Sequence, residues 1–106
     1  MWYTVNLLYK STHIPTESNP TIWEERILLI SAVSEAEARD IAEQIGNSSA
    51  QTYQVEDGIV VWSFERIDRV HSVEKEELVS GTEVFSRFLR DSEVTSLLTP
   101  FDDDES

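Results

Sequence analysis

The residues best suited to chemistry in this sequence stand together at the start of an apolar run. The segment Trp23–Arg26 contains an indole, two carboxylates and a guanidinium, and the run Ile27–Ile30 follows it directly. Paired carboxylates can share a proton in acid–base catalysis when both reach one cleft. Side chains alternate along a strand, however, so Glu24 and Glu25 point to opposite faces. A solvated strand end with cross-strand charge pairs is therefore favoured over a functional cluster.

A second charged group lies near the end of the chain, where Glu83 and Arg87 are four residues apart. This spacing would pair them on one face of a helix. Ser86 lies between them, but no histidine stands at a spacing typical of a nucleophilic triad. An ordinary surface ion pair is the favoured interpretation.

Metal and cofactor sites are not predicted. The chain has no cysteine, and its two histidines, His13 and His71, lie far apart in or beside expected loops. Structural zinc sites require a group of such ligands. The three glycines, at 46, 58 and 81, form no phosphate-binding motif. We therefore assign no catalytic, metal-binding or cofactor-binding residue.

The charge of the chain restricts its partners. A formal net charge of −13 over 106 residues would repel nucleic acid, whose phosphates dominate affinity. An anionic membrane surface is disfavoured for the same reason. A basic protein partner is the natural expectation, because opposite potentials speed encounter. The alternative is that the acidic surface serves only solubility.

The first part of the chain predicts two strands that position the charged segment. Residues 2–10 alternate apolar and polar side chains, which is typical of a strand. Residues 11–20 contain two prolines and predict a loop. Residues 22–32 predict a second strand, and its central apolar block indicates burial on both faces.

A helix is the most secure prediction. Ser34 precedes Glu37 by three residues, which is the pattern of a capping box. Gly46 predicts the end of the helix. Apolar residues follow at helical spacing and predict one buried stripe: Ala38, Ile41, Ala42 and Ile45.

A hairpin is predicted next, because Asp57-Gly58 separates the apolar runs 51–55 and 59–67. The alternation changes phase near Glu65, which indicates a bulge. These runs add two strands to the sheet.

The rest of the chain is less regular. Residues 72–81 suggest a short helical turn, residues 82–90 fit either a strand or a helix, and residues 91–98 predict a short helix capped by Asp91 or Ser92. We expect one α+β domain over residues 1–100, with an acidic disordered tail at 101–106. Its sheet has four or five antiparallel strands, one main helix covers one face, and a C-terminal segment or short helix closes an edge.

The order of these blocks resembles a bacterial family named domain of unknown function 4288. The resemblance rests on five segments in sequence: Trp2–Tyr9, Trp23–Leu28, Ser34–Ile45, Val60–Phe64 and Gly81–Phe88. It implies a small stand-alone bacterial domain and brings no activity, cofactor or catalytic residue. It also implies that the blocks 23–26 and 83–87 belong to one surface region.

These observations favour a non-enzymatic protein-interaction module that sequesters a basic partner. The first alternative is a homo-oligomeric module that pairs through a sheet edge or an aromatic patch. The second is a small acid–base or metal-dependent enzyme that uses Glu24, Glu25 and Glu83. No basic leader or long apolar run is present, so a cytoplasmic protein is expected. The candidate interaction surface comprises Trp23, Glu24, Glu25, Arg26, Glu83 and Arg87.

Overall fold

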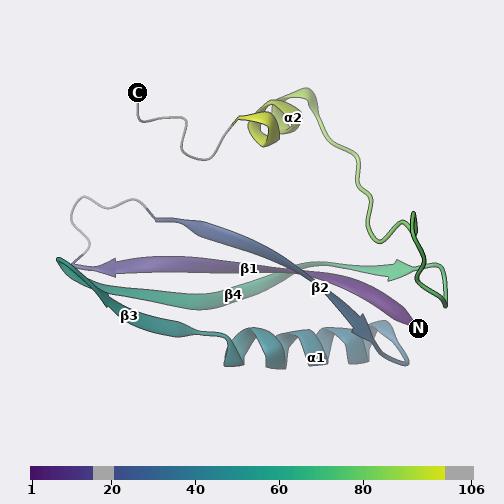
Figure 1. Ribbon diagram of the computed structural model, residues 1–106, viewed down its shortest axis with the longest axis horizontal. Coiled ribbons are helices and arrows are strands. Elements are labelled where there is room, and N and C mark those ends of the chain that lie inside the picture. The colour runs from purple at the N-terminus through teal and green to yellow at the C-terminus, as the bar shows by residue number, and fades with distance from the viewer. Residues whose placement is uncertain (16–20, 100–106) are drawn as a thin grey trace.

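The computed structural model describes residues 1–15 and 21–99 of the chain. They form, in order, β1 (Trp2–Ile14), β2 (Trp23–Ser31), α1 (Glu35–Ser48), β3 (Gln51–Val55), β4 (Gly58–Val73) and α2 (Asp91–Leu98). The four strands make one antiparallel sheet in the order β2-β1-β4-β3. α1 lies along one face of this curled sheet, and α2 lies beyond the opposite face (Figure 1). The α+β prediction is therefore confirmed.

The central strand β1 provides the floor of the core. Its alternate side chains Tyr3, Val5, Leu7 and Tyr9 are all at most 5% exposed and lie on the face that α1 covers. The strand continues past the expected end at residue 10. Residues 11–14 are strand and not loop, because the 16-residue β4 supplies pairing partners as far as the end of β1.

The start of α1 matches its predicted cap. Ser34 Oγ accepts a hydrogen bond from the backbone N–H of Glu37 at 3.2 Å, which satisfies one free donor of the first turn. The predicted end at Gly46 is wrong, since the helix continues to Ser48. Gly46 instead lies buried in the helix against the ring of Phe64.

The buried stripe of α1 differs from the predicted one. Ala38, Ala42 and Gly46 are buried, four residues apart along one line of the helix. Ile41 packs at the margin of the core, and Ile45 is 40% exposed. Small side chains line the contact because they allow the helix backbone to approach the sheet closely.

The prediction that β2 is buried on both faces is wrong. Leu28 and Ile30 contribute to the core under α1, but Ile27 and Leu29 remain 51% and 44% exposed. The alternation of a strand sends these two pairs to opposite faces. Only the first face of β2 is covered by a helix within the described residues.

The β3–β4 hairpin is confirmed at the predicted turn, where Val55 pairs with Gly58. Gly58 has a φ of +153°, which favours glycine. A Cβ atom at this position would also overlap the carbonyl oxygen of Ile14. The predicted bulge at Glu65 is present, since Leu8 pairs with Arg66 whereas the next residue of β1 pairs with Phe64.

The C-terminal part forms an arm across the second face of the sheet. Thr4 Oγ1 donates to the Val84 carbonyl at 2.8 Å, and the rings of His71 and Phe85 lie 5.6 Å apart. The arm thus contacts a face, whereas an edge was expected. Residues 72–81 contain no helix, and residues 82–90 are neither strand nor helix.

α2 occupies the predicted residues, although its N-cap is Arg90 and not Asp91 or Ser92. No residue of α2 is buried in the part of the chain that the structure describes. The expected disordered tail at 101–106 falls outside the described residues.

Candidate functional site

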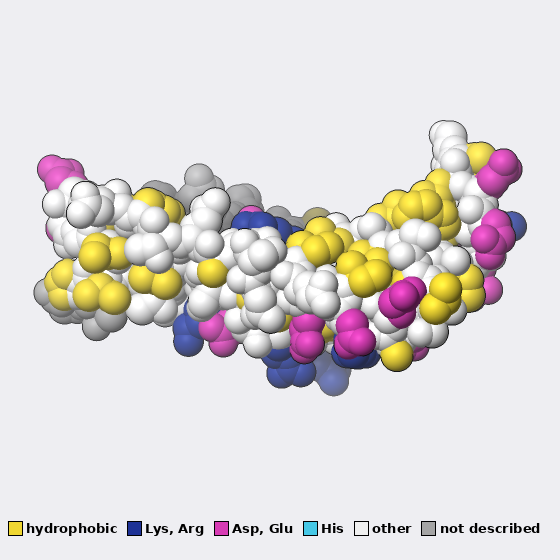
Figure 2. Space-filling view, turned by 90° about the horizontal axis from the view of Figure 1, so that it is seen from below, with side chains coloured by type: hydrophobic (Ala, Val, Ile, Leu, Met, Phe, Trp, Pro, Cys, Tyr) yellow, Lys and Arg dark blue, Asp and Glu magenta, His cyan; other side chains and the backbone are white. Residues whose placement is uncertain are grey.

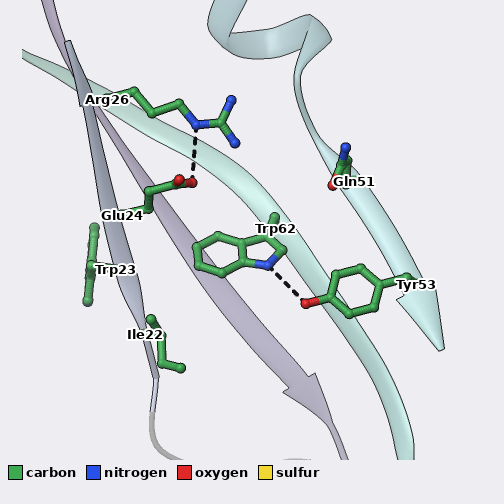
Figure 3. Close-up of a pocket in the computed structure, with 7 residues that line it drawn as sticks. All are labelled: Ile22, Trp23, Glu24, Arg26, Gln51, Tyr53 and Trp62. Carbon is green, nitrogen blue, oxygen red and sulfur yellow. Dashed lines mark hydrogen bonds and ion pairs between the residues drawn. The ribbon is translucent and has the colours of Figure 1, made fainter. Parts of the chain in front are cut away.

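An open groove lies on the α1 face of the sheet, beyond the C-terminal end of the helix. It has a volume of about 410 Å³ and runs between β2 on one side and β3 on the other, over β1 and β4 (Figure 3). Its lining comprises Ile22, Trp23, Glu24, Arg26, Gln51, Tyr53 and Trp62.

The wall on the β2 side is formed mainly by Glu24 and Arg26, from the charged start of the strand. Arg26 Nε donates to Glu24 Oε1 at 3.1 Å. The guanidinium also lies 4.3 Å from the centre of the buried Tyr9 ring, where the negative face of the ring attracts it. Both charged side chains are well exposed, at 45% for Glu24 and 39% for Arg26. Solvent therefore keeps the ion pair weak, while the ring beneath fixes the direction of Arg26.

The opposite wall is aromatic. The Trp62 indole N–H donates to Tyr53 Oη at 3.4 Å (Figure 3). Gln51 pairs with Trp62 in the ladder between β3 and β4, so it lies beside this contact. Trp62 packs against the core, whereas Tyr53 is 47% exposed. In this aromatic wall, Trp62 is therefore held in place by the core, whereas Tyr53 is open to solvent.

The other two residues of the charged segment belong to the opposite face of β2, as the alternation predicted. Trp23 pairs with Lys10, whose Nζ lies 5.5 Å from the indole centre, and the indole reaches only the rim of the groove. Glu25 accepts a hydrogen bond from Asn6 Nδ2 at 2.9 Å. The two neighbouring carboxylates, of Glu24 and Glu25, therefore serve different surfaces.

The second charged block does not join the first. Glu83 precedes Val84, which is bonded to Thr4 on the face opposite Glu24. Thr4 lies six residues before Lys10 along β1, and Lys10 pairs with Trp23 at the start of the charged segment. At the rise of a strand, the two positions on β1 are roughly 20 Å apart. Arg87 lies further along the same arm. Glu24 and Glu83 thus share no cleft, so a catalytic site built from Glu24, Glu25 and Glu83 lacks the geometry it requires.

The histidines make local contacts. His13 lies with Nε2 3.3 Å from Asp57 Oδ1 and with Nδ1 2.7 Å from the Pro15 carbonyl. His71 packs its ring against the edge of Phe85. Among residues 1–15 and 21–99, no group of three or more potential metal ligands is found.

Four residues of the groove were absent from the predicted surface: Ile22, Gln51, Tyr53 and Trp62. The period-2 pattern of residues 51–55 indicates that the side chains of Gln51 and Tyr53 share a face. What the sequence lacks is the strand order that places this face opposite β2. Trp62 is partly buried against the core, and it also forms part of the groove wall.

The fold and groove define a class: a small α+β domain with a curled four-stranded antiparallel sheet, one covering helix and an open groove. The chain belongs to the family described as Domain of unknown function (DUF4288), whose model matches residues 2–86. The match spans the whole sheet and α1 and ends before α2. No curated protein and no solved structure matches the chain. None of the helices in the described residues could cross a membrane.

Proposed function

We propose that this domain is a non-enzymatic protein-interaction module that binds a segment of a basic partner in the groove. The supporting observation is the composition of the groove walls, which combine Trp62, Tyr53 and Arg26 with Trp23 at the rim. Tryptophan, tyrosine and arginine are the residues most enriched at the energetic centres of protein interfaces. The large exposed fractions of Trp23 and Tyr53, 51% and 47%, leave apolar area for a partner to cover.

The charge of the domain supports a basic partner. The net charge of −13 creates a field that speeds the approach of a positively charged segment. On the α1 face, hydrophobic patches lie toward both ends, and acidic side chains lie among them and along the middle, where lysine and arginine side chains also gather (Figure 2). Glu24 adds a carboxylate at the groove itself. A segment with a lysine or arginine beside an apolar residue fits these walls.

The exposure of the charged pair favours binding over catalysis. Electrostatic catalysis depends on a water-excluded site in which charges are fixed before the reaction. Glu24 and Arg26 are instead about 40% exposed and pair with each other. Exposed charges of this kind contribute to the rate and specificity of association.

The test uses alternate residues of one short strand. Gln51 and Tyr53 line the groove, whereas Thr52 and Gln54 do not. The full chain is immobilised as wild type, as Gln51→Ala/Tyr53→Ala and as the matched control Thr52→Ala/Gln54→Ala, and each is exposed to native lysate at low and high salt. Circular dichroism confirms that all three are folded.

A stoichiometric protein is expected on the wild type and the control but not on the groove variant. High salt should weaken the capture, because exposed charges more than about 8 Å apart are largely screened at 0.15 M salt. Capture by all three proteins alike would exclude the groove as the binding site. Affinity that does not change with salt would exclude the electrostatic contribution.

A further inference from the structure

The outer edge of β2 presents an unpaired row of backbone groups. β2 is a terminal strand of the sheet, and no strand of the described residues pairs with its outer side. Its nine residues include no proline, lysine or bulge, three of the devices that commonly protect an edge from pairing. Its charged residues, Glu24, Glu25 and Arg26, are confined to one end of the strand. Trp23 and Ile27 on this strand are each 51% exposed. An edge of this kind is a template for another strand.

The hydrogen-bond phase shows which residues face outward. At the two ends of the β1–β2 ladder, the Ala32 N–H donates to the Met1 carbonyl and the Ser11 N–H donates to the Ile22 carbonyl. The register between the strands has no shift. Even-numbered residues of β2 therefore bond to β1, and odd-numbered residues direct N–H and C=O outward. Trp23, Glu25 and Ile27 are the outward residues at the charged end.

We propose that β2 pairs antiparallel with β2 of a second copy, about a two-fold axis at Glu25. This register places Glu24 opposite Arg26 of the second copy, and the symmetry repeats that ion pair. On the other face, this register places Trp23 opposite Ile27 of the second copy, and the two-fold axis repeats this apolar pair as well. About six backbone hydrogen bonds join the outward residues 23, 25 and 27. The edge is thus self-complementary in charge, in apolar side chains and in backbone groups.

Other two-fold registers lose this complementarity. Centring the pair on Arg26 places the two guanidinium groups opposite each other and Glu24 opposite Leu28. Centring it on Ile27 places Arg26 opposite Leu28 and Glu24 opposite Ile30. Opposite charges across a strand pair stabilise it and like charges destabilise it, so the register centred on Glu25 is the one that the charges select.

The repulsion at the two-fold axis is reduced by a contact within each copy. Two Glu25 side chains directly opposite each other would destabilise the pair. Asn6 Nδ2, at 2.9 Å from Glu25 Oε2, draws each carboxylate back toward β1 and away from the edge. Glu25→Gln removes the remaining repulsion and should tighten the dimer.

This dimer goes beyond the proposed function and does not depend on it. It uses the outer edge of β2, whereas the partner test changes residues of β3 on the far side of the sheet. Gln51→Ala/Tyr53→Ala should leave the dimer unchanged. Failure of one proposal is therefore distinguishable from failure of the other.

The first experiment is sedimentation of the full chain from about 5 µM to about 1 mM, a range that covers weak to moderate self-association. Wild type should pass from monomer to dimer. Ile27→Pro removes an N–H that has no partner in its own sheet, and Ile27→Ala is the matched loss of side chain. Proline should weaken the dimer at least about tenfold more than alanine.

Charge exchange then tests the register. Glu24→Arg and Arg26→Glu should each weaken the dimer, and the double variant should restore it, because each ion pair is re-formed in reverse. The charge-exchange experiment remains a valid test even if Ile27→Pro does not fold. A wild type that stays monomeric at every concentration would overturn the proposal, as would a dimer that neither single charge reversal weakens.

Discussion

The contact between Gly46 of α1 and the ring of Phe64 offers a sharp test of the packing. A Cβ atom at Gly46 would lie 2.8–2.9 Å from three ring carbons of Phe64. Carbon atoms prefer separations of about 3.5–4.0 Å, so the ring would have to retreat by roughly half an ångström or more. The ring also packs against Tyr9, whose ring centre is 5.7 Å away. Gly46→Ala is therefore an overpacking substitution.

Two effects oppose each other in this variant. Replacing glycine by alanine inside a helix gains about 1 kcal/mol, while forcing an extra carbon into a packed site costs about 1–3 kcal/mol. The net expectation is a loss of about 1 kcal/mol in the free energy of unfolding. In the Phe64→Leu background the flat ring is gone, so only the gain in helix propensity, about 0.5–1 kcal/mol, should remain. The effect of Gly46→Ala should thus change sign.

Urea unfolding of the four proteins in this double-mutant cycle measures the coupling directly. We expect a coupling of about 1–3 kcal/mol, well above the few tenths that independent sites show. If Gly46→Ala had the same effect in both backgrounds, the close approach of helix and ring would be refuted. A stabilising Gly46→Ala in the wild-type background would refute the steric argument as well.

Two further predictions follow from burial. Tyr9 is fully buried and its Oη has no hydrogen-bond partner among residues 1–15 and 21–99, so Tyr9→Phe should raise the free energy of unfolding by about 1 kcal/mol; an unchanged or lower urea midpoint would mean that the hydroxyl is satisfied. Since no described residue of α2 is buried, truncation after Arg90 should change stability by less than about 0.5 kcal/mol, whereas a clear fall in melting temperature would show that the helix docks on the domain.

Local patterns predicted the elements of this fold well. The capping box at Ser34 and the turn at Asp57-Gly58 each depend on residues within a few positions, and both are present in the structure. The bulge at Glu65 was visible as a change of phase in the side-chain alternation. Short-range chemistry therefore decided where α1 began and where β3 turned into β4.

The errors arose where the outcome depends on neighbours distant in sequence. Gly46 resembles a helix stop, but the approach of Phe64 makes it a packing residue instead. Ile27 and Leu29 resemble core residues, yet the second face of β2 lacks a covering layer in the described part of the chain. The groove was missed for the same reason. Tyr53 lies across the groove from the β2 wall only because the strand order is β2-β1-β4-β3.

The charged start of β2 faces several surfaces because a strand alternates the directions of both its side chains and its backbone groups. Side-chain alternation sends Glu24 and Arg26 to the groove and Glu25 to Asn6 on the other face. Backbone alternation sends the N–H of Ile27 outward, away from β1. Substitutions of Gln51 and Tyr53 in β3 thus change binding in the groove alone. Proline at Ile27 changes pairing at the edge of β2 alone. Glu24 and Arg26 contribute to both surfaces, so a charge exchange between them should restore the dimer while it alters the charge pattern that a basic partner meets.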